Sequence, residues 1–195
     1  MTIETVAGPS ALVAAVATVV GGVTLGLFFA KGQPWGTIND VSSIVLMLAT
    51  IPVALAIASV TSSWFAWSAG AAAVGIVGMV GASVTQGLLV ARRRSYEELL
   101  PWTLGFGAVV GVWYLLIGLG GVRSPFFNND LIGLDELAIA SGISFIALGY
   151  GFLRGNERHP LSITGGIVLL VSSTWFLMWL GLDTVTGTIG FGGGA

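Results

Sequence analysis

The sequence predicts an all-α fold, a polytopic membrane protein built as a bundle of six transmembrane helices. Six apolar runs occupy most of the 195 residues. Each is long enough to cross a bilayer, since a helix needs about 20 apolar residues to span the roughly 30 Å hydrocarbon core. Charged residues make up 8% of the chain, against about 25% in ordinary soluble domains, so a soluble fold could not bury this apolar surface. The runs cover approximately residues 8–30, 41–61, 64–91, 100–122, 134–153 and 161–182.

The first two runs begin in different ways. The first follows Glu4 and no basic residue, and it is longer than the apolar core of a signal peptide, so we expect a retained spanning helix. The second directly follows Asp40. We interpret Asp40 as a helix cap, and a proton- or cation-binding carboxylate is the alternative. Pro52, midway along this run, removes one backbone hydrogen bond and predicts a kink.

Small residues recur at helical spacing along the third, fourth and fifth runs. Such a stripe lets another backbone approach closely, because packing drives helix association in lipid. The stripes predict a tightly packed bundle, and the seam of a homodimer is the alternative. They comprise Ala71, Gly75, Gly78, Ala82 and Thr85; then Gly107, Gly111, Tyr114 and Gly118; then Ala140, Ser144, Ala147 and Gly151.

We expect one transmembrane domain over residues 1–186, followed by a flexible, glycine-rich C-terminal tail over 187–195. Two tryptophans lie deep within their runs. Trp113 is in the fourth run and Trp175 in the sixth, and core packing of both indoles is expected.

The basic residues predict the orientation in the membrane. Six of the seven lysines and arginines lie in the odd-numbered connections, which share one side of the bilayer. Short loops rich in Lys and Arg stay in the cytoplasm, so we expect a plasma-membrane protein of a prokaryote with both termini outside. The six are Lys31, Arg92, Arg93, Arg94, Arg154 and Arg158, and Arg123 is the exception.

The two halves of the sequence share a weak pattern. A basic residue, a proline–aromatic pair and an Asn–Asp pair follow the first run and recur after the fourth run at offsets of 90 to 92 residues. Because each half has three spans, a genuine repeat would be inverted, which is a construction principle of transporters. The alternative is that Pro, Asn and Asp are simply the residues that turns and helix starts use.

Two residues within the spans are candidates for ligand contact. Gln86 is the only amide deep in a span and follows Ala82 on the small-residue face. We expect it to hydrogen-bond a neighbouring helix first and to contact a ligand second. If the protein has a cavity, Tyr114 is expected to line it together with Gln86.

Acidic residues cluster before the fifth run. Asp130, Asp135 and Glu136 lie close to two asparagines, and such oxygen ligands could bind a hard cation. A solvated loop is the alternative, because the spacing of a calcium-binding EF-hand is absent. Glu136 falls on the face of Ala140 and Ser144, so its carboxylate could point into the bundle, where it would be a functional candidate.

The sequence carries no signature of a common enzyme or of a nucleic-acid-binding protein. Cysteine is absent and His159 is the sole histidine, which leaves no thiol nucleophile and no metal predicted. Hydrolase, zinc-protease and phosphate-loop motifs are missing, and no basic, aromatic-interleaved surface predicts nucleic acid. No cofactor can be deduced.

Two stretches, residues 36–57 and 152–170, resemble small six-span bacterial membrane proteins of unknown function, the DUF4386-type group. The resemblance implies the six-span architecture and brings no activity and no site residues. From the packing stripes we therefore expect a non-enzymatic membrane protein in contact with the lipid bilayer. It would be a subunit or accessory of a membrane-protein complex, or a homo-oligomer. The alternative hypothesis is a small transporter or channel.

Overall fold

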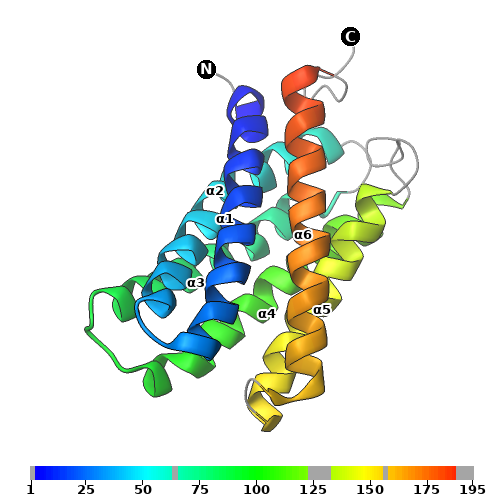
Figure 1. Ribbon diagram of the computed structural model, residues 1–195. Helices are drawn as coiled ribbons and strands as arrows, with labels where there is room; N and C mark the ends of the chain where they lie inside the picture. Colours follow the sequence, from blue (N-terminus) through cyan, green and yellow to red (C-terminus); the bar gives the residue numbers. More distant parts are fainter. Residues whose placement is uncertain (1–2, 63–65, 123–132, 156–157, 188–195) are drawn as a thin grey trace.

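The structure, a computed structural model, describes residues 3–62, 66–122, 133–155 and 158–187 (Figure 1). Six helices make up this part of the chain, and all are long and apolar enough to cross a membrane. The predicted six-helix membrane bundle is therefore confirmed. The helices are α1 (Ile3–Lys31), α2 (Trp35–Thr61), α3 (Ser68–Val90), α4 (Tyr96–Gly121), α5 (Leu134–Gly155) and α6 (Pro160–Thr186).

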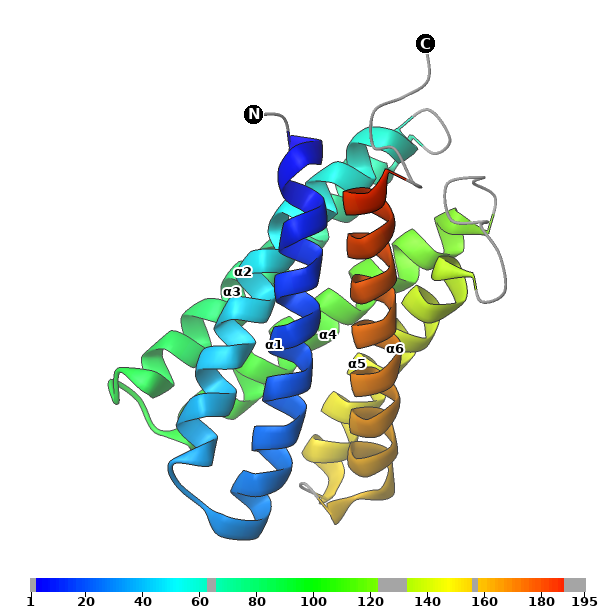
Figure 2. The ribbon, with the colours of Figure 1, turned by 45° about the horizontal axis from the view of Figure 1, so that its top comes forward.

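The helices form a closed ring in chain order. Within the described ranges each helix packs against its two neighbours in sequence, and α6 closes the ring against α1 (Figures 1 and 2). No helix occupies the centre, so side chains alone fill the interior. We call the end of the bundle with the loops after α1, α3 and α5 the basic end, because Lys31, the arginines at 92–94, Arg154 and Arg158 lie there. The opposite end carries the start of α1 and the end of α6 and is called the terminal end (Figure 2).

The ring order differs from the order expected of an inverted repeat. Seen from one side of the membrane, α1–α2–α3 and α4–α5–α6 follow each other around the ring in the same sense. α1 and α4, the first helices of the two triplets, run in opposite directions across the membrane. Viewed from the end where its own first helix begins, one triplet therefore turns clockwise and the other anticlockwise. A two-fold axis in the membrane plane would give both the same sense. For the described residues, the helix contacts therefore favour the alternative, that the shared residues reflect turns and helix starts.

α1, α2 and α4 begin several residues before their apolar runs. α2 starts at Trp35 with Pro34 at the N-cap position, and the side-chain oxygen of the preceding Gln33 accepts hydrogen bonds from the Thr37 backbone N–H at 3.3 Å and hydroxyl at 3.1 Å. Asp40 consequently lies in the second turn and is not the cap that we predicted. α4 starts at Tyr96, where the Ser95 hydroxyl accepts a hydrogen bond from the Glu98 N–H at 3.3 Å. A helix continues past the hydrocarbon boundary wherever a local cap supports it.

The predicted small-residue stripes form the seams between neighbouring helices of the chain. All five residues of the α3 stripe are buried, and Gly75 and Gly78 face Trp113 and Val110 of α4. Between α4 and α5, a Cβ built on Gly142 would stand 2.6 Å from the carbonyl oxygen of Gly111. The stripes thus explain the packing within one chain. They are not available as the homodimer seam that we considered.

The two deep tryptophans behave differently. Trp113 is fully buried, as predicted. Trp175 is 42% exposed and stacks on Trp179, with ring centroids 6.3 Å apart, so its predicted place in the core is wrong. The buried face of α6 is supplied instead by its neighbours Phe176 and Leu177, which turns Trp175 towards lipid.

Core side chains fill the interior on the terminal side of the bundle. They come from all six helices and are mostly small on α1 and larger on α4 and α6. This part of the core includes Ala7, Ala11, Ala14, Val53, Ala54, Ile57, Ala71, Ile117, Leu134, Ala138, Phe176, Leu177 and Leu180. The interior on the basic side is built differently and contains the candidate site.

A candidate binding cavity near the basic end

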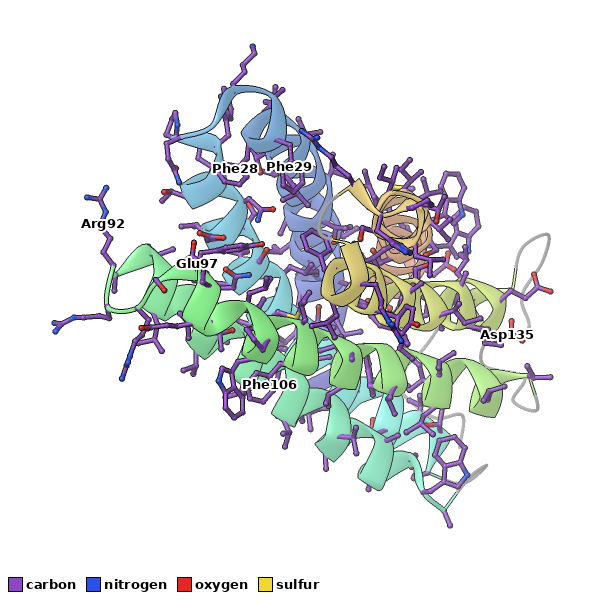
Figure 3. The ribbon with its side chains drawn as sticks, turned by 90° about the horizontal axis from the view of Figure 1, so that it is seen from below. Phe28, Phe29, Arg92, Glu97, Phe106 and Asp135 are labelled. Carbon is purple, nitrogen blue, oxygen red and sulfur yellow. The ribbon has the colours of Figure 1, made fainter. Side chains whose placement is uncertain are left out.

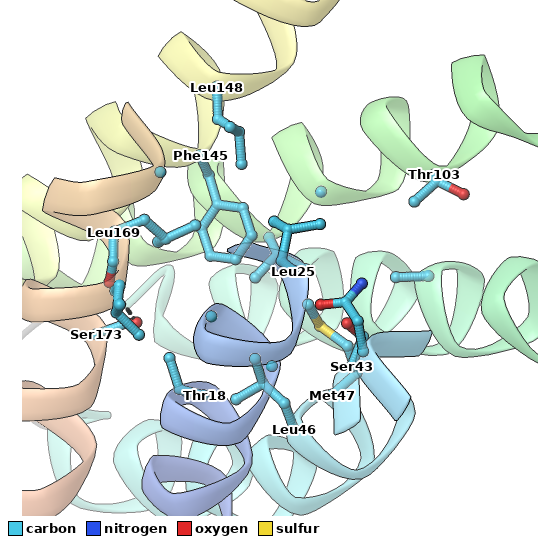
Figure 4. Close-up of a pocket in the computed structure, with 18 of the residues that line it drawn as sticks. Thr18, Leu25, Ser43, Leu46, Met47, Thr103, Phe145, Leu148, Leu169 and Ser173 are labelled. Atoms are coloured by element: carbon cyan, nitrogen blue, oxygen red, sulfur yellow. Dashed lines mark hydrogen bonds between the residues drawn. The ribbon is translucent and has the colours of Figure 1, made fainter. Parts of the chain in front are cut away.

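A cavity of about 230 Å³ lies inside the ring, and all six helices line it (Figure 4). The lining segments are 17–25 of α1, 39–50 of α2, 82–86 of α3, 103–114 of α4, 145–149 of α5 and 166–173 of α6. Because successive helices run in opposite directions, these segments extend from the middle of the bundle towards the basic end. The cavity therefore occupies one half of the membrane, and the packed core closes it towards the terminal end.

Aromatic rings form the deep wall of the cavity. Tyr114 lines it and is 2% exposed. The centroid of its ring lies 6.1 Å from that of Phe145 and 5.6 Å from that of Phe176, the latter in an edge-on arrangement. Figure 4 shows the ring of Phe145 beside Leu25, with Thr103 on one side and Ser173 on the other. The centre of the cavity is thus apolar and its polar groups lie around it.

Three hydroxyl groups at the cavity use their hydrogen on the backbone of their own helix. Thr18 donates to the carbonyl of Ala14 at 2.8 Å, Thr50 to that of Leu46 at 2.7 Å, and Ser173 to that of Leu169 at 2.6 Å. Each residue is buried and lines the cavity. With the donor used in this way, each oxygen can only accept a hydrogen bond from a molecule in the cavity.

Further polar groups of the cavity residues have no partner in the part of the chain that the structure describes, and the same holds for two buried groups outside the cavity, the Trp113 indole N–H and the Thr174 hydroxyl. The side-chain oxygens of Gln86 and Thr103 are buried without a hydrogen bond, and both residues line the cavity. The Tyr114 hydroxyl likewise makes no hydrogen bond to a described residue. Buried polar groups are normally paired, and an unpaired one costs about 1–3 kcal/mol. The hydrogen bond from Gln86 to a neighbouring helix, which we expected, is not formed.

The cavity wall carries no charge. Among the described residues that line it there is no Asp, Glu, Lys, Arg or His. Asp40 is only partly buried and is not a lining residue, although its neighbour Asn39 is. An ion would therefore enter without a counter-charge, which is costly in a low-dielectric interior.

The acidic candidates lie away from this cavity. Asp135 and Glu136 are in the first turn of α5, near the terminal end, and Figure 3 shows Asp135 at the far side of the bundle from Arg92. Glu136 is exposed, so its carboxylate does not point into the bundle. Asp130 lies outside the described residues. Within the described ranges no three His, Asp or Glu side chains come together to hold a metal ion.

The structure thus brings together two of the six predicted site residues, Gln86 and Tyr114. It adds Thr103 and Ser43, which the sequence analysis did not single out. The sequence contained one signal for Thr103, which lies one helical turn before Gly107 on the predicted stripe of the fourth run. Nothing in the sequence distinguishes Ser43 from other serines in the spans.

The fold and the cavity define a class: this is an integral, multi-pass α-helical membrane protein with an uncharged internal cavity. No family model, curated protein or solved structure matches the chain.

Proposed function

We propose that this protein binds a small uncharged molecule within the membrane, in the cavity near the basic end. One observation carries the proposal: the interior holds an uncharged, mostly apolar cavity of about 230 Å³ to which Gln86, Thr103 and Tyr114 add a few polar side chains. Ligand pockets in proteins are typically concave and mostly apolar, with a small number of polar groups that orient the ligand.

The size of the cavity limits the ligand. Its volume of about 230 Å³ exceeds the about 150 Å³ of an apolar cavity that holds benzene. It is smaller than the about 300–1,000 Å³ of pockets for drug-sized ligands. The ligand is therefore a molecule of one ring or a short chain.

We further propose that the cavity faces the cytoplasmic half of a prokaryotic plasma membrane. The support is the distribution of Lys and Arg in short loops, since the described ones all lie at the basic end. The packed core on the terminal side argues against an open channel. It favours a binding protein, or a carrier in a state that is closed to the outside. The packing stripes, which motivated the hypothesis of a complex subunit, are occupied within the chain.

Native mass spectrometry of the protein extracted in mild detergent tests the binding function. Gly107 lines the cavity, and a Cβ there would be 3.8 Å from the Phe145 ring, so the side chain of Gly107→Leu would fill the cavity. Gly105, on the same helix, is exposed with nothing within 4 Å, so Gly105→Leu is the matched control. We expect a small bound mass on the wild type and on Gly105→Leu that Gly107→Leu lacks. The same set of bound masses on all three proteins would contradict the proposal.

A further inference from the structure

We propose that the cavity opens sideways into the bilayer between α1 and α6, and that its ligand is an apolar molecule dissolved in the lipid. This inference rests on the proposed function and adds the route of entry and the class of ligand. It follows from the way α1 and α6 meet along their length, from two glycines that face each other beside the cavity, and from one leucine next to them.

α1 and α6 are in close contact at the terminal end and diverge towards the basic end (Figures 1 and 2). Near the terminal end, a Cβ built on Gly181 would stand 3.0 Å from the carbonyl oxygen of Gly8, which is a backbone atom. Further towards the basic end, the three atoms nearest to a Cβ on Gly22 all belong to the side chain of Leu170, and the closest is 2.6 Å away. The contact between the helices thus changes from backbone against backbone to the flexible end of a side chain.

Two glycines face each other one turn beyond this contact. α1 and α6 are antiparallel, so four residues forward from Gly22 on α1 match four residues back from Leu170 on α6. This register places Gly26 opposite Gly166. A Cβ on Gly26 would have nothing within 4 Å, and for Gly166 the one neighbour in the described part of the chain is Leu148 of α5, at 3.7 Å. Because Gly22, Gly166 and Leu170 line the cavity, this open stretch between the helices lies beside it.

Other neighbouring helices are closed against each other in the same half of the bundle. A Cβ on Gly151 of α5 would stand 2.5 Å from the backbone nitrogen of Ser162 on α6. Between α3 and α4, the ring of Phe106 lies directly over Gly81. Loops join both of these pairs at the basic end, whereas no loop joins α1 to α6. The seam between α1 and α6 is therefore a weaker barrier between the cavity and the lipid than either of these.

The opening is apolar, which decides the class of ligand. Leu25 and Leu170 line the cavity at this level of α1 and α6, and Ile167 is 58% exposed on the outer surface of α6. A molecule that partitions into hydrocarbon reaches the opening directly, whereas a hydrophilic molecule would first have to lose its hydration. The end of the Leu170 side chain can move by a change of rotamer, so we assign it as the movable barrier at the opening.

A probe that cannot leave the membrane tests the route of entry. It is a phospholipid that carries a phenyl diazirine at the end of a short acyl chain, and the reference is the free phenyl diazirine, which can enter by any route. The protein is reconstituted in lipid nanodiscs and irradiated with each probe, and tandem mass spectrometry then measures labelling of Phe145 on the cavity wall. We expect both probes to label Phe145 in the wild type, because the tethered ring reaches the cavity from the lipid.

Two substitutions at the opening and one control locate the route. Gly26→Phe places a ring in the open stretch and should abolish labelling of Phe145 by the tethered probe, while its unfolding midpoint shows whether the variant is folded. Leu170→Ala removes the barrier and should increase this labelling. Gly105→Phe, at an exposed site with nothing within 4 Å, should leave it unchanged.

The outcomes separate the two proposals. Labelling of Phe145 by the free probe but not by the tethered probe in the wild type would overturn the lateral opening and leave the binding function standing. Tethered-probe labelling as strong in folded Gly26→Phe as in Gly105→Phe would overturn it too, and no increase in Leu170→Ala would overturn the role of Leu170. Labelling by both probes no greater in the wild type than in Gly107→Leu would overturn the binding function as well.

Discussion

At Gly111 and Gly142 the backbones of α4 and α5 approach closely. A Cβ on Gly142 would meet the Gly111 carbonyl oxygen at 2.6 Å and the Leu115 nitrogen at 2.8 Å. Both obstacles are backbone atoms, which cannot move aside as the end of a flexible side chain can. The absence of a side chain at Gly142 is therefore what allows the two helices to cross at this distance.

Gly142→Ala should lower the stability of the protein by about 1–3 kcal/mol, the usual cost of overpacking a well-packed interior. Gly105→Ala is the control, because Gly105 is exposed and has open space around it. There the better helix propensity of alanine should stabilise by about 0.5–1 kcal/mol. Thermal unfolding in detergent compares the two. Equal midpoints for both variants would show that the close crossing does not limit the packing of α4 on α5.

Individual residues were predictable from the sequence only where a spacing rule applied. The α3 stripe repeats small residues every three or four positions, and that spacing places Ala71 and Gly75 in a seam whichever helix is the neighbour. Trp175 had no such pattern. Its depth in the run suggested the core, but its direction around the helix depends on where α1 and α5 lie. The unpaired state of Gln86 likewise depends on neighbours that the sequence does not specify.

At the scale of elements, a hydrogen-bond contact between two buried serines links α5 and α6. The hydroxyls of Ser141 and Ser172 lie 2.9 Å apart. Each oxygen also lies 2.8 Å from a carbonyl of its own helix, Ser141 from Leu137 and Ser172 from Val168, and since each hydroxyl has one hydrogen, the serine that donates to the other gives up the bond to its carbonyl. The loss of either partner therefore leaves the other hydroxyl bonded to its own backbone.

A double-mutant cycle with Ser141→Ala and Ser172→Ala should give a small coupling energy, about 0.6 kcal/mol, which is the average for polar pairs between membrane helices. Unfolding in mixed micelles measures it. Ser83 donates to the carbonyl of Met79 at 2.8 Å and lies on α3, so Ser83→Ala paired with Ser141→Ala should show no coupling. A value for the serine pair above about 1.7 kcal/mol, the largest typical of such contacts, would contradict this account.

The sequence predicted the helices as elements better than it predicted their ends. Apolar length alone indicates six spans, because a run of about 20 apolar residues has few alternatives in a membrane protein. The starts of α2 and α4 differ from the prediction because polar residues such as Thr37 and Glu97 extend a helix beyond the hydrocarbon. There, a local hydrogen bond to the Gln33 side chain, or the Ser95 cap, supports the first turn.

At the scale of the whole molecule, orientation is open to a direct test. The chain has no cysteine, so a single introduced cysteine reports its own position. Thr2→Cys should react with an impermeant thiol reagent on intact cells, whereas Glu97→Cys should react only after lysis. Glu97 is exposed at the start of α4, and its replacement leaves the Ser95 cap intact. Labelling of Glu97→Cys in intact cells would reverse the proposed orientation and place the cavity in the outer half of the membrane.

The order of the helices around the ring could not be deduced from the sequence. The similar residues after the first and fourth runs suggested an inverted repeat, yet Pro, Asn and Asp recur wherever a turn leads into a helix. Hydropathy gives the spans, and successive spans cross the membrane in alternating directions. It does not show which helices lie next to one another in the bundle. The ring order depends on which small-residue faces match, and Gly8, Gly165 and Gly181 take part in it without any conspicuous pattern.

Closure of the ring by α6 has a consequence for biogenesis. The last helix packs against both α5 and the first helix, so the contacts of greatest sequence separation form only after the whole chain has entered the bilayer. Until then, the face of α1 with Gly8 and Leu12 and the face of α5 with Ser144 and Leu148 adjoin lipid instead of α6. Helices that insert independently associate in a later stage, and long-range contacts are slow to form. A nascent chain halted before α6 would therefore display two unmatched faces to the insertion machinery and to membrane proteases.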